Sequence, residues 1–130
     1  MKLEHVAINL PVHPKEVAQW YVDNLDMIVV RAQEEAPYMT FIADKNKASM
    51  MEIYHNTTVD LPDYSKINAF NLHFAFLVED DMEAVRDRLV AAGATAEGDI
   101  QDTPFGDRLL FLRDPWNITV QLVQRKEPLL

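Results

Sequence analysis

The first residues of the chain alternate between polar and apolar side chains. Between residues 3 and 10, His5 shares one face with Ala7, whereas Val6 and Ile8 lie on an opposite face that is wholly apolar. A period of two predicts a β-strand, and its apolar face must be covered by a helix or by a second sheet.

Two later segments carry apolar residues at helical spacing. Pro14 suits the first turn of a helix, and apolar residues recur through residues 17–25. The second helix is expected to be capped by Asp80 or Asp81 and to end at Gly93. Its apolar stripe consists of Met82, Val85 and Leu89.

Seven further segments have the alternating or β-branched composition of strands. They are residues 27–33, 38–43, 48–55, 72–78, 95–100, 108–113 and 118–124. The order of elements is therefore βαβββ, linker, βαβββ, which predicts an α+β fold of two tandem modules. We expect a single domain over residues 1–130, with module 1 at about 1–56, a linker without clear period at about 57–71, and module 2 at about 72–125.

The two halves of the chain match each other at polar positions as well as in their elements. The tripeptide at residues 5–7 (His-Val-Ala) returns 68 positions later as His-Phe-Ala. The dipeptide at residues 52–53 (Glu-Ile) returns 69 positions later as Gln-Leu. This internal duplication predicts two similar sheets related by a pseudo-twofold axis.

Four polar side chains occupy equivalent places in the two halves, namely His5, Glu52, His73 and Gln121. Each has an apolar neighbour that belongs to the opposite strand face. If those neighbours pack against the helices, the four polar groups point into the concave side of the sheets. Two imidazoles, a carboxylate and an amide oxygen are a suitable donor set for a first-row divalent metal ion with open positions for water or substrate.

Each of these residues also has an ordinary structural interpretation. A histidine on a half-buried strand is most often a hydrogen-bonded packing residue, and a glutamate or glutamine on a strand most often faces solvent. The common placement by one repeat favours a shared site. An unpaired carboxylate inside a concave sheet would also be costly without a cation or donors to satisfy it.

Composition and charge exclude several classes of function. The 130 residues are 48% apolar and 25% charged, as in ordinary globular proteins, and the net charge of −9 disfavours binding to nucleic acid or to an anionic membrane surface. The absence of cysteine excludes a disulfide framework, a thiol nucleophile and an iron–sulfur site. The N-terminal residues lack the apolar stretch of a signal peptide, and no run approaches a membrane span, so we expect a soluble, cytoplasmic protein.

The order of elements and four stretches of sequence resemble the vicinal oxygen chelate superfamily. The stretches are Leu3–Asn9, Met51–Tyr54, Asn71–Phe76 and Arg113–Leu122. This superfamily includes glyoxalase I, the bleomycin and fosfomycin resistance proteins, methylmalonyl-CoA epimerase and the extradiol dioxygenases. The resemblance covers nearly the whole chain and implies a curved, barrel-like mixed sheet with helices outside. It is less specific for function, because one scaffold serves several chemistries.

In the metal-binding members of this superfamily, the ligands come from the first and last strands of each module. The positions that correspond here are His5, Glu52, His73 and Gln121. Bacterial-type glyoxalase I has two histidines and two glutamates there, so this chain departs at Gln121. Glutamine is a ligand in some relatives, and the resemblance therefore still implies one divalent ion per site (nickel, cobalt, zinc, manganese or iron). It also implies a small-molecule substrate and a homodimer.

Two further departures from the family concern the backbone. Asp26 and Asn117 stand where relatives often have glycine. Both residue types tolerate the left-handed backbone region better than most others, so we expect the two turns to form.

Gln121 changes the chemistry that the resemblance implies. An amide oxygen can coordinate an ion but cannot hold a proton near neutral pH, so Glu52 would be both ligand and catalytic base. The first hypothesis is thus a divalent-metal-dependent lyase or isomerase, glyoxalase-like, that acts on a small oxygenated substrate able to chelate the ion.

Two alternatives remain at the level of the sequence. One is a metal-free small-molecule binding protein that resembles the bleomycin resistance proteins; it requires a donor that neutralises Glu52 and an aromatic-lined groove. The other is an extradiol-type dioxygenase. Gln121 disfavours the second alternative, because those relatives have a glutamate in the last strand.

Overall fold

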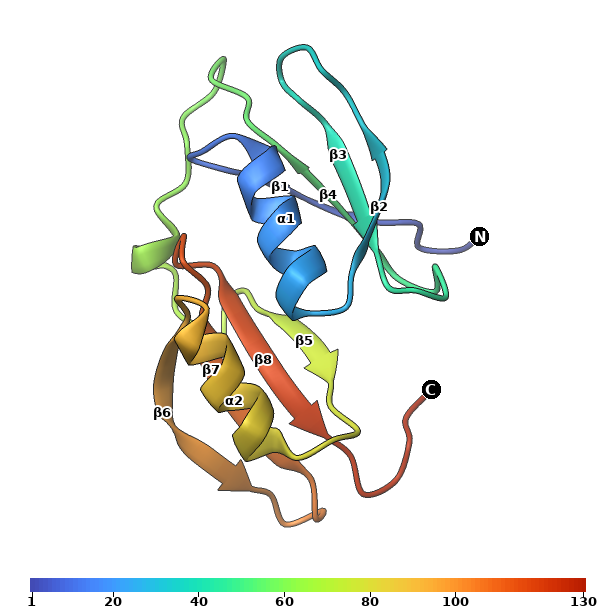
Figure 1. Ribbon diagram of the computed structural model, residues 1–130, viewed down its shortest axis with the longest axis vertical. Helices are drawn as coiled ribbons and strands as arrows, with labels where there is room; N and C mark the ends of the chain where they lie inside the picture. Colours follow the sequence, from blue (N-terminus) through green and yellow to red (C-terminus); the bar gives the residue numbers. More distant parts are fainter. The chain divides into compact units, whose positions relative to one another are not determined.

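Each half of the chain folds into a four-stranded mixed sheet with one α-helix (Figure 1). The computed structural model describes all 130 residues and divides into two units, Met1–Asp63 and Tyr64–Leu130. We call them unit 1 and unit 2 and describe each by itself.

Unit 1 contains the first five elements of the chain. They are β1 (Val6–Asn9), α1 (Pro14–Asn24), β2 (Ile28–Ala32), β3 (Thr40–Ala43) and β4 (Met50–Tyr54). The sheet has the order β1-β4-β3-β2; β1 is parallel to β4, and the other pairs are antiparallel.

Unit 2 repeats this arrangement after a short 3₁₀ helix, η1, at Tyr64–Lys66, within the segment interpreted as a linker. Its elements are β5 (Phe74–Leu77), α2 (Met82–Ala91), β6 (Thr95–Asp102), β7 (Arg108–Arg113) and β8 (Thr119–Gln124). The sheet has the order β5-β8-β7-β6, again with one parallel pair, β5 with β8.

The predicted α+β class and the two βαβββ modules are confirmed. Each sheet by itself is open, with two unpaired edge strands, because the first strand of each module pairs only with the last one. This parallel pairing places the beginning of each module beside its end. Residues that are distant in the sequence, such as those at 5 and 52, are therefore brought close together.

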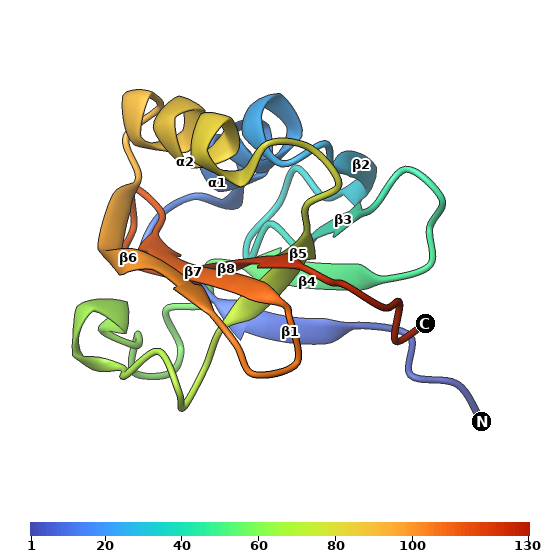
Figure 2. The same ribbon diagram turned by 90° about the horizontal axis from the view of Figure 1, so that it is seen from below.

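In each unit, the helix covers one face of its own sheet (Figure 2). Helix α1 contacts β2, β3 and β4, and its Val17 and Tyr21 are buried together with Ile42 and Ile53 of the sheet. In unit 2, helix α2 contacts β6, and its buried Leu89 serves the same purpose. The opposite faces of the sheets therefore carry the residues that alternate with these core positions.

The helices begin where the sequence indicates. His13 caps α1, with its Nδ1 accepting a hydrogen bond from the Lys15 amide at 3.1 Å, and Pro14 occupies the first turn. Asp81 caps α2 by accepting from the Ala84 amide at 3.1 Å. Neither helix is long and apolar enough to cross a membrane.

Four residues other than glycine occupy the left-handed backbone region, and Asp26 and Asn117 are two of them. Asp26 has φ 56° and Asn117 has φ 68°, as expected for residues that replace glycine. In the turn that contains Asn117, the carboxylate of Asp114 accepts hydrogen bonds from the amides of Trp116 and Ile118, both at 2.9 Å. These bonds fix the turn between β7 and β8.

The expectation that all four apolar neighbours of the candidate ligands pack against helices holds fully for only two of them. Ile53 and Leu122, on the inner strands β4 and β8, are buried. Val6 is 44% exposed and Phe74 is half-buried. The reason is that β1 and β5 are edge strands, which have a neighbour on one side only.

Candidate functional site

In unit 1, the register of the sheet brings the polar candidates to one face. Glu52 pairs with Ala7 on one side and with Phe41 on the other. His5 directly precedes β1, and its contact with Glu52 places its ring on the same face. That face is opposite to the one that α1 covers.

His5 lies between two carboxylates. Its Nε2 is 3.2 Å from Oε2 of Glu52, and its Nδ1 is 2.8 Å from Oε2 of Glu4. The ring also meets the ring of Phe41 edge to face, with the centroids 5.6 Å apart. The side chain of Glu52 is only 13% exposed, so this carboxylate is held largely away from water beside the imidazole.

A neutral His5 ring has one N–H and can therefore donate to only one of its two carboxylate neighbours. If Nδ1 donates its proton to Glu4, the lone pair of Nε2 faces an oxygen of the Glu52 carboxylate, and two acceptors repel each other. A second proton on the ring relieves this repulsion, and so does a cation held between the two atoms. Two ligand atoms bound to one divalent ion at its usual bond lengths lie roughly 2.8–3.6 Å apart, and the observed 3.2 Å falls in this range.

Unit 2 repeats this arrangement, with the amide of Gln121 in the place of the Glu52 carboxylate. Gln121 pairs with Ala75 and with Phe111, as Glu52 pairs with Ala7 and Phe41. His73 precedes Ala75 by two residues, and its ring meets that of Phe111 edge to face at 5.3 Å. Gln121 is buried.

His73 is oriented by the backbone and not by a carboxylate. Its Nδ1 is 2.8 Å from the carbonyl oxygen of Ala69. Because a carbonyl only accepts, Nδ1 carries the proton, and Nε2 of the neutral ring keeps its lone pair. A histidine whose other nitrogen is held in this way is the usual form of a metal ligand.

We call His5, Phe41 and Glu52 half-site 1, and His73, Phe111 and Gln121 half-site 2. The structure brings His5 and Glu52 into contact, and it places His73 and Gln121 on one face of the second sheet. The two pairs belong to different units. Within either unit, no group of three or more histidine, aspartate or glutamate side chains is arranged to hold a metal ion. Each half-site thus offers one pair of donors.

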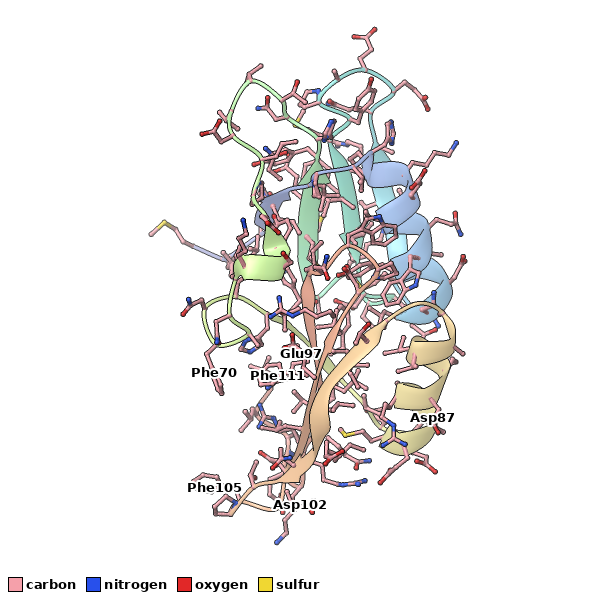
Figure 3. All side chains as sticks on the ribbon, turned by 90° about the vertical axis from the view of Figure 1, so that its left-hand side faces the viewer. Phe70, Asp87, Glu97, Asp102, Phe105 and Phe111 are labelled. Carbon is pink, nitrogen blue, oxygen red and sulfur yellow. The ribbon has the colours of Figure 1, made fainter.

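The two phenylalanines were missed in the sequence, although the repeat could have revealed them. Phe41 and Phe111 lie 70 positions apart, close to the 68 and 69 of the polar pairs. Phe70, which was also missed, is 83% exposed and meets Phe111 edge to face at 5.7 Å (Figure 3). Phe70, Phe111 and His73 therefore form a row of three rings, which we call the aromatic row. The sequence gives no periodic signal for Phe70, because it lies outside the strands.

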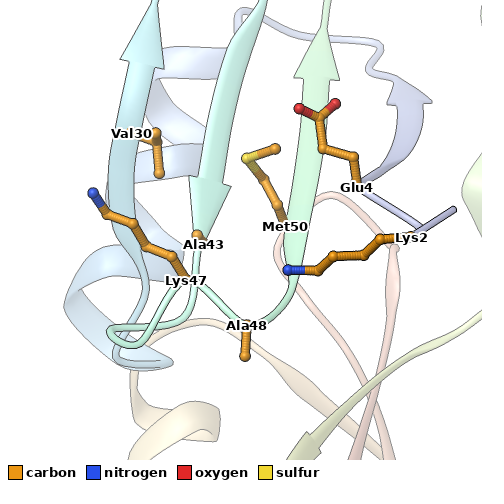
Figure 4. A pocket seen from close by; sticks show the side chains of 7 residues that line it. All are labelled: Lys2, Glu4, Val30, Ala43, Lys47, Ala48 and Met50. Atoms are coloured by element: carbon orange, nitrogen blue, oxygen red, sulfur yellow. The ribbon is translucent and has the colours of Figure 1, made fainter.

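A cavity of about 370 Å³ opens beside half-site 1 (Figure 4). Its lining includes Glu4, which contacts His5, and Met50, which precedes Glu52 by two residues on the same strand face. Two lysines, Lys2 and Lys47, also line it (Figure 4). The cavity is large enough for a small organic molecule and offers it both ammonium groups and apolar walls.

A charged pair in unit 2 joins the sheet to helix α2 and takes no part in half-site 2. Arg108 of β7 forms an ion pair with Glu83 of α2. The hydrogen bond from the Arg108 guanidinium lowers the pKa of Glu83 to about 2. The positive charge of Arg108 is therefore engaged by carboxylates.

The fold is similar to that of many solved structures. A glyoxalase family protein from Bacillus cereus has a TM-score of 0.78 at 17% identity, with 95% of this chain and 93% of that chain covered. A glyoxalase/bleomycin resistance protein/dioxygenase superfamily member from Sphaerobacter thermophilus has a TM-score of 0.74 at 14% identity, with 96% and 98% covered. TnmS3, an antibiotic binding protein from Streptomyces sp. CB03234, has a TM-score of 0.72 at 17% identity, with 97% of each chain covered.

These likenesses show the fold, and the sequence itself shows the family. No curated protein matches the chain. Residues 2–122 match the Glyoxalase/Bleomycin resistance protein/Dioxygenase superfamily as a whole. This match spans both modules, including all four candidate ligands. The chain belongs to the glyoxalase/bleomycin resistance protein/dioxygenase superfamily.

Proposed function

We propose that this protein is a divalent-metal-dependent lyase or isomerase that acts on a small oxygenated substrate able to chelate the ion. The observation that supports this most directly is the 3.2 Å separation between Nε2 of His5 and Oε2 of Glu52. The two atoms have the spacing of neighbouring ligands, and a neutral imidazole can donate to only one of the two carboxylates beside it. His73, with its Nδ1 held by a carbonyl, has the orientation that a ligand requires.

The proposed ligands are one pair from each half-site, His5 with Glu52 and His73 with Gln121. A bound divalent ion would polarise the oxygens of a chelating substrate. Glu52 is the only carboxylate of this set, and we assign it the role of general base as well as ligand. Gln121 contributes an amide oxygen that can coordinate but not accept the proton.

The cavity beside half-site 1 is the proposed place of the substrate. It reaches half-site 1 through Glu4, and Lys2 and Lys47 supply positive charge for substrate oxygens. We further propose that the protein acts as a homodimer, as relatives of this length commonly do. Sedimentation analysis would show twice the mass of one chain, and a monomer at every protein concentration would contradict this part.

Metal analysis tests the proposal directly. Protein purified without a histidine tag would be stripped with a chelator and then dialysed against nickel, cobalt, zinc, manganese or iron(II). We expect about one ion per chain with at least one of these metals. Glu52→Ala should abolish this binding, whereas Glu35→Ala, which removes an exposed carboxylate of the same unit, should not. Protein that stays empty with every metal would overturn the proposal.

A second candidate function is the metal-free binding of a small aromatic molecule. The aromatic row favours it, because Phe70 exposes most of its ring next to Phe111 and His73. In this case a doubly protonated His5 would neutralise Glu52. The likeness to an antibiotic binding protein agrees with this function. Binding of planar aromatic compounds by chelator-treated protein, lost in Phe70→Ala, would support it.

A further inference from the structure

Arg113 at the end of β7 binds the backbone of the segment that leads to His73. Its guanidinium donates from Nη1 to the carbonyl of Tyr64 at 3.0 Å and from Nη2 to that of Ile67 at 2.9 Å. Nη1 also donates to the carbonyl of Asn117 at 3.1 Å, and Nε donates to the carboxylate of Glu97 at 2.6 Å. The side chain of Arg113 is only 13% exposed.

These bonds join three parts of unit 2. Asn117 lies in the turn between β7 and β8, Glu97 lies on the neighbouring strand β6, and the carbonyls of Tyr64 and Ile67 belong to η1 and its end. A planar guanidinium presents its donors in a fixed fork, so it sets the position of the bonded carbonyls relative to the sheet. A lysine has a single ammonium group at the end of its side chain, so it cannot bind the same set of carbonyl and carboxylate oxygens.

The bonded segment continues into a tight turn. The amide of Phe70 donates to Oδ1 of Asn68 at 2.9 Å, and the amide of Asn71 donates to the Asn68 carbonyl at 2.9 Å. Ala69, between them, is buried. Only one residue, Asn68, separates Ile67, whose carbonyl Arg113 holds, from Ala69. The position of the Ala69 carbonyl therefore depends on the position of Ile67.

The carbonyl of Ala69 in turn holds the ring of His73 through Nδ1, at 2.8 Å. We infer that Arg113 is a positioning residue for His73: by fixing residues 64–69 it sets the carbonyl that selects the tautomer and orientation of the imidazole. This inference rests on the proposed function for its consequence in metal binding, but the arrangement itself can be tested without metal.

The test measures the tautomer of His73 in chelator-treated protein. Long-range ¹H–¹⁵N correlation at about pH 8.5, two units above the ordinary imidazole pKa of about 6.5, reports which ring nitrogen carries the proton. In the native protein we expect His73 to be protonated at Nδ1. In Arg113→Gln we expect a mixture in which the Nε2–H form is readily detected, and in Arg113→Lys a smaller change in the same direction.

Arg108→Gln is the matched control. Arg108 lies on the same strand and is also partly buried, but its bonds go to the carboxylates of Glu83 and Asp102 and not to residues 64–69. The tautomer of His73 should remain native in this variant. If either Arg113 variant folds and keeps the native tautomer, the inference is wrong. Arg113→Lys retains the charge, so it decides the matter if Arg113→Gln fails to fold.

Metal titration then separates this inference from the proposed function. Arg113→Gln should weaken metal binding about 10- to 100-fold, as expected when the group that orients a ligand is lost, and Arg108→Gln should leave it unchanged. If the native protein binds no metal, the proposed function fails while the tautomer still tests Arg113. If metal binds and the tautomer does not respond to Arg113, the positioning role alone fails.

Discussion

The two half-sites occupy the same places in their sheets and differ in charge. In both, a histidine lies two residues before an alanine that pairs with the acid or amide position, and a phenylalanine pairs with that position from the other side. In half-site 1, His5 lies between the carboxylates of Glu4 and Glu52. In half-site 2, His73 binds a backbone carbonyl, and the partner position is the uncharged Gln121.

This difference shows which properties a duplicated fold preserves. The backbone register fixes where a side chain is presented, and this property is the same in both units. The identity of the side chain, and hence its charge and protons, is independent of register and has diverged. We therefore expect half-site 1 to supply the electrostatic attraction for a cation, and half-site 2 to supply neutral donors that complete its shell.

Removal of the carboxylate from half-site 1 should have the largest effect. Glu52→Gln makes the two half-sites alike in charge at this position while it conserves size. Metal affinity should fall on the order of 100-fold or more, because the one charged donor of the set is lost. Gln121→Ala should cost only about tenfold. Titration of chelator-treated protein with cobalt would measure both, and equal losses would contradict the assignment of charge to half-site 1.

Addition of a carboxylate to half-site 2 should have the opposite sign. Gln121→Glu gives both half-sites a carboxylate, and an additional negative ligand strengthens the binding of a hard divalent ion. We expect metal affinity to rise about tenfold, with the gain growing as the pH rises through the usual range of a carboxyl group. Competition with a chromophoric chelator would measure this. A decrease in affinity would mean that Gln121 is not near the ion.

The aromatic rings should contribute unequally to stability. An edge-to-face pair contributes about 0.5–1.5 kcal/mol beyond the burial of its area. Phe111 contacts two rings, those of His73 and Phe70, whereas Phe41 contacts that of His5. Phe111→Leu should therefore lower the free energy of unfolding more than Phe41→Leu, by about 1 kcal/mol. Urea unfolding would measure the difference. Phe70→Ala, at an exposed position, should change the free energy of unfolding by less than about 0.5 kcal/mol.

The smallest effect concerns an ion pair that only unit 2 possesses. Arg108 lies three residues before Phe111. The equivalent position of unit 1, three residues before Phe41, is occupied by Tyr38, which cannot form such an ion pair. The hydrogen bond from Arg108 lowers the pKa of Glu83 from 4.5 to about 2, so the carboxylate is stabilised in the folded state. This contribution is complete above about pH 4.5 and is lost as the pH falls toward 2.

Glu83→Gln should remove this part of the acid sensitivity. Its thermal unfolding midpoint should decline less than that of the native protein as the pH falls from 4.5 to 2, the window set by the two values for Glu83. The substitution of an exposed acid outside the pair, such as Asp60→Asn, serves as the control. Parallel declines in all three proteins would show that the ion pair contributes nothing measurable to stability.

The sequence predicted the elements and the internal repeat. These follow from alternation and from the pairing of the first strand with the last, which are regular along the chain. It did not predict the contact of Glu4 with His5, because adjacent residues of a strand point to opposite faces. Residues 1–5 lie outside the strand, where that alternation no longer applies.

Other features depend on contacts that no local pattern encodes. Val6 belongs to an apolar face but is exposed, since its strand lies at an edge of the sheet. Arg113 reaches carbonyl groups 46 and 49 positions earlier in the chain. Nothing near residue 113 indicates this reach, because the acceptors are backbone atoms that every residue type possesses.

The turn at residues 114–118 has a consequence for any change in its length. The carboxylate of Asp114 closes this loop on the amides of Trp116 and Ile118, and the strand that follows presents Gln121 and Leu122 to opposite sides. One inserted residue, accommodated by slippage of β8, would exchange these sides, so that Val120 would take the place of the amide in the half-site and Gln121 would enter the core at the place of Leu122. Asp114 thus protects the chemical identity of a position seven residues downstream that it does not touch.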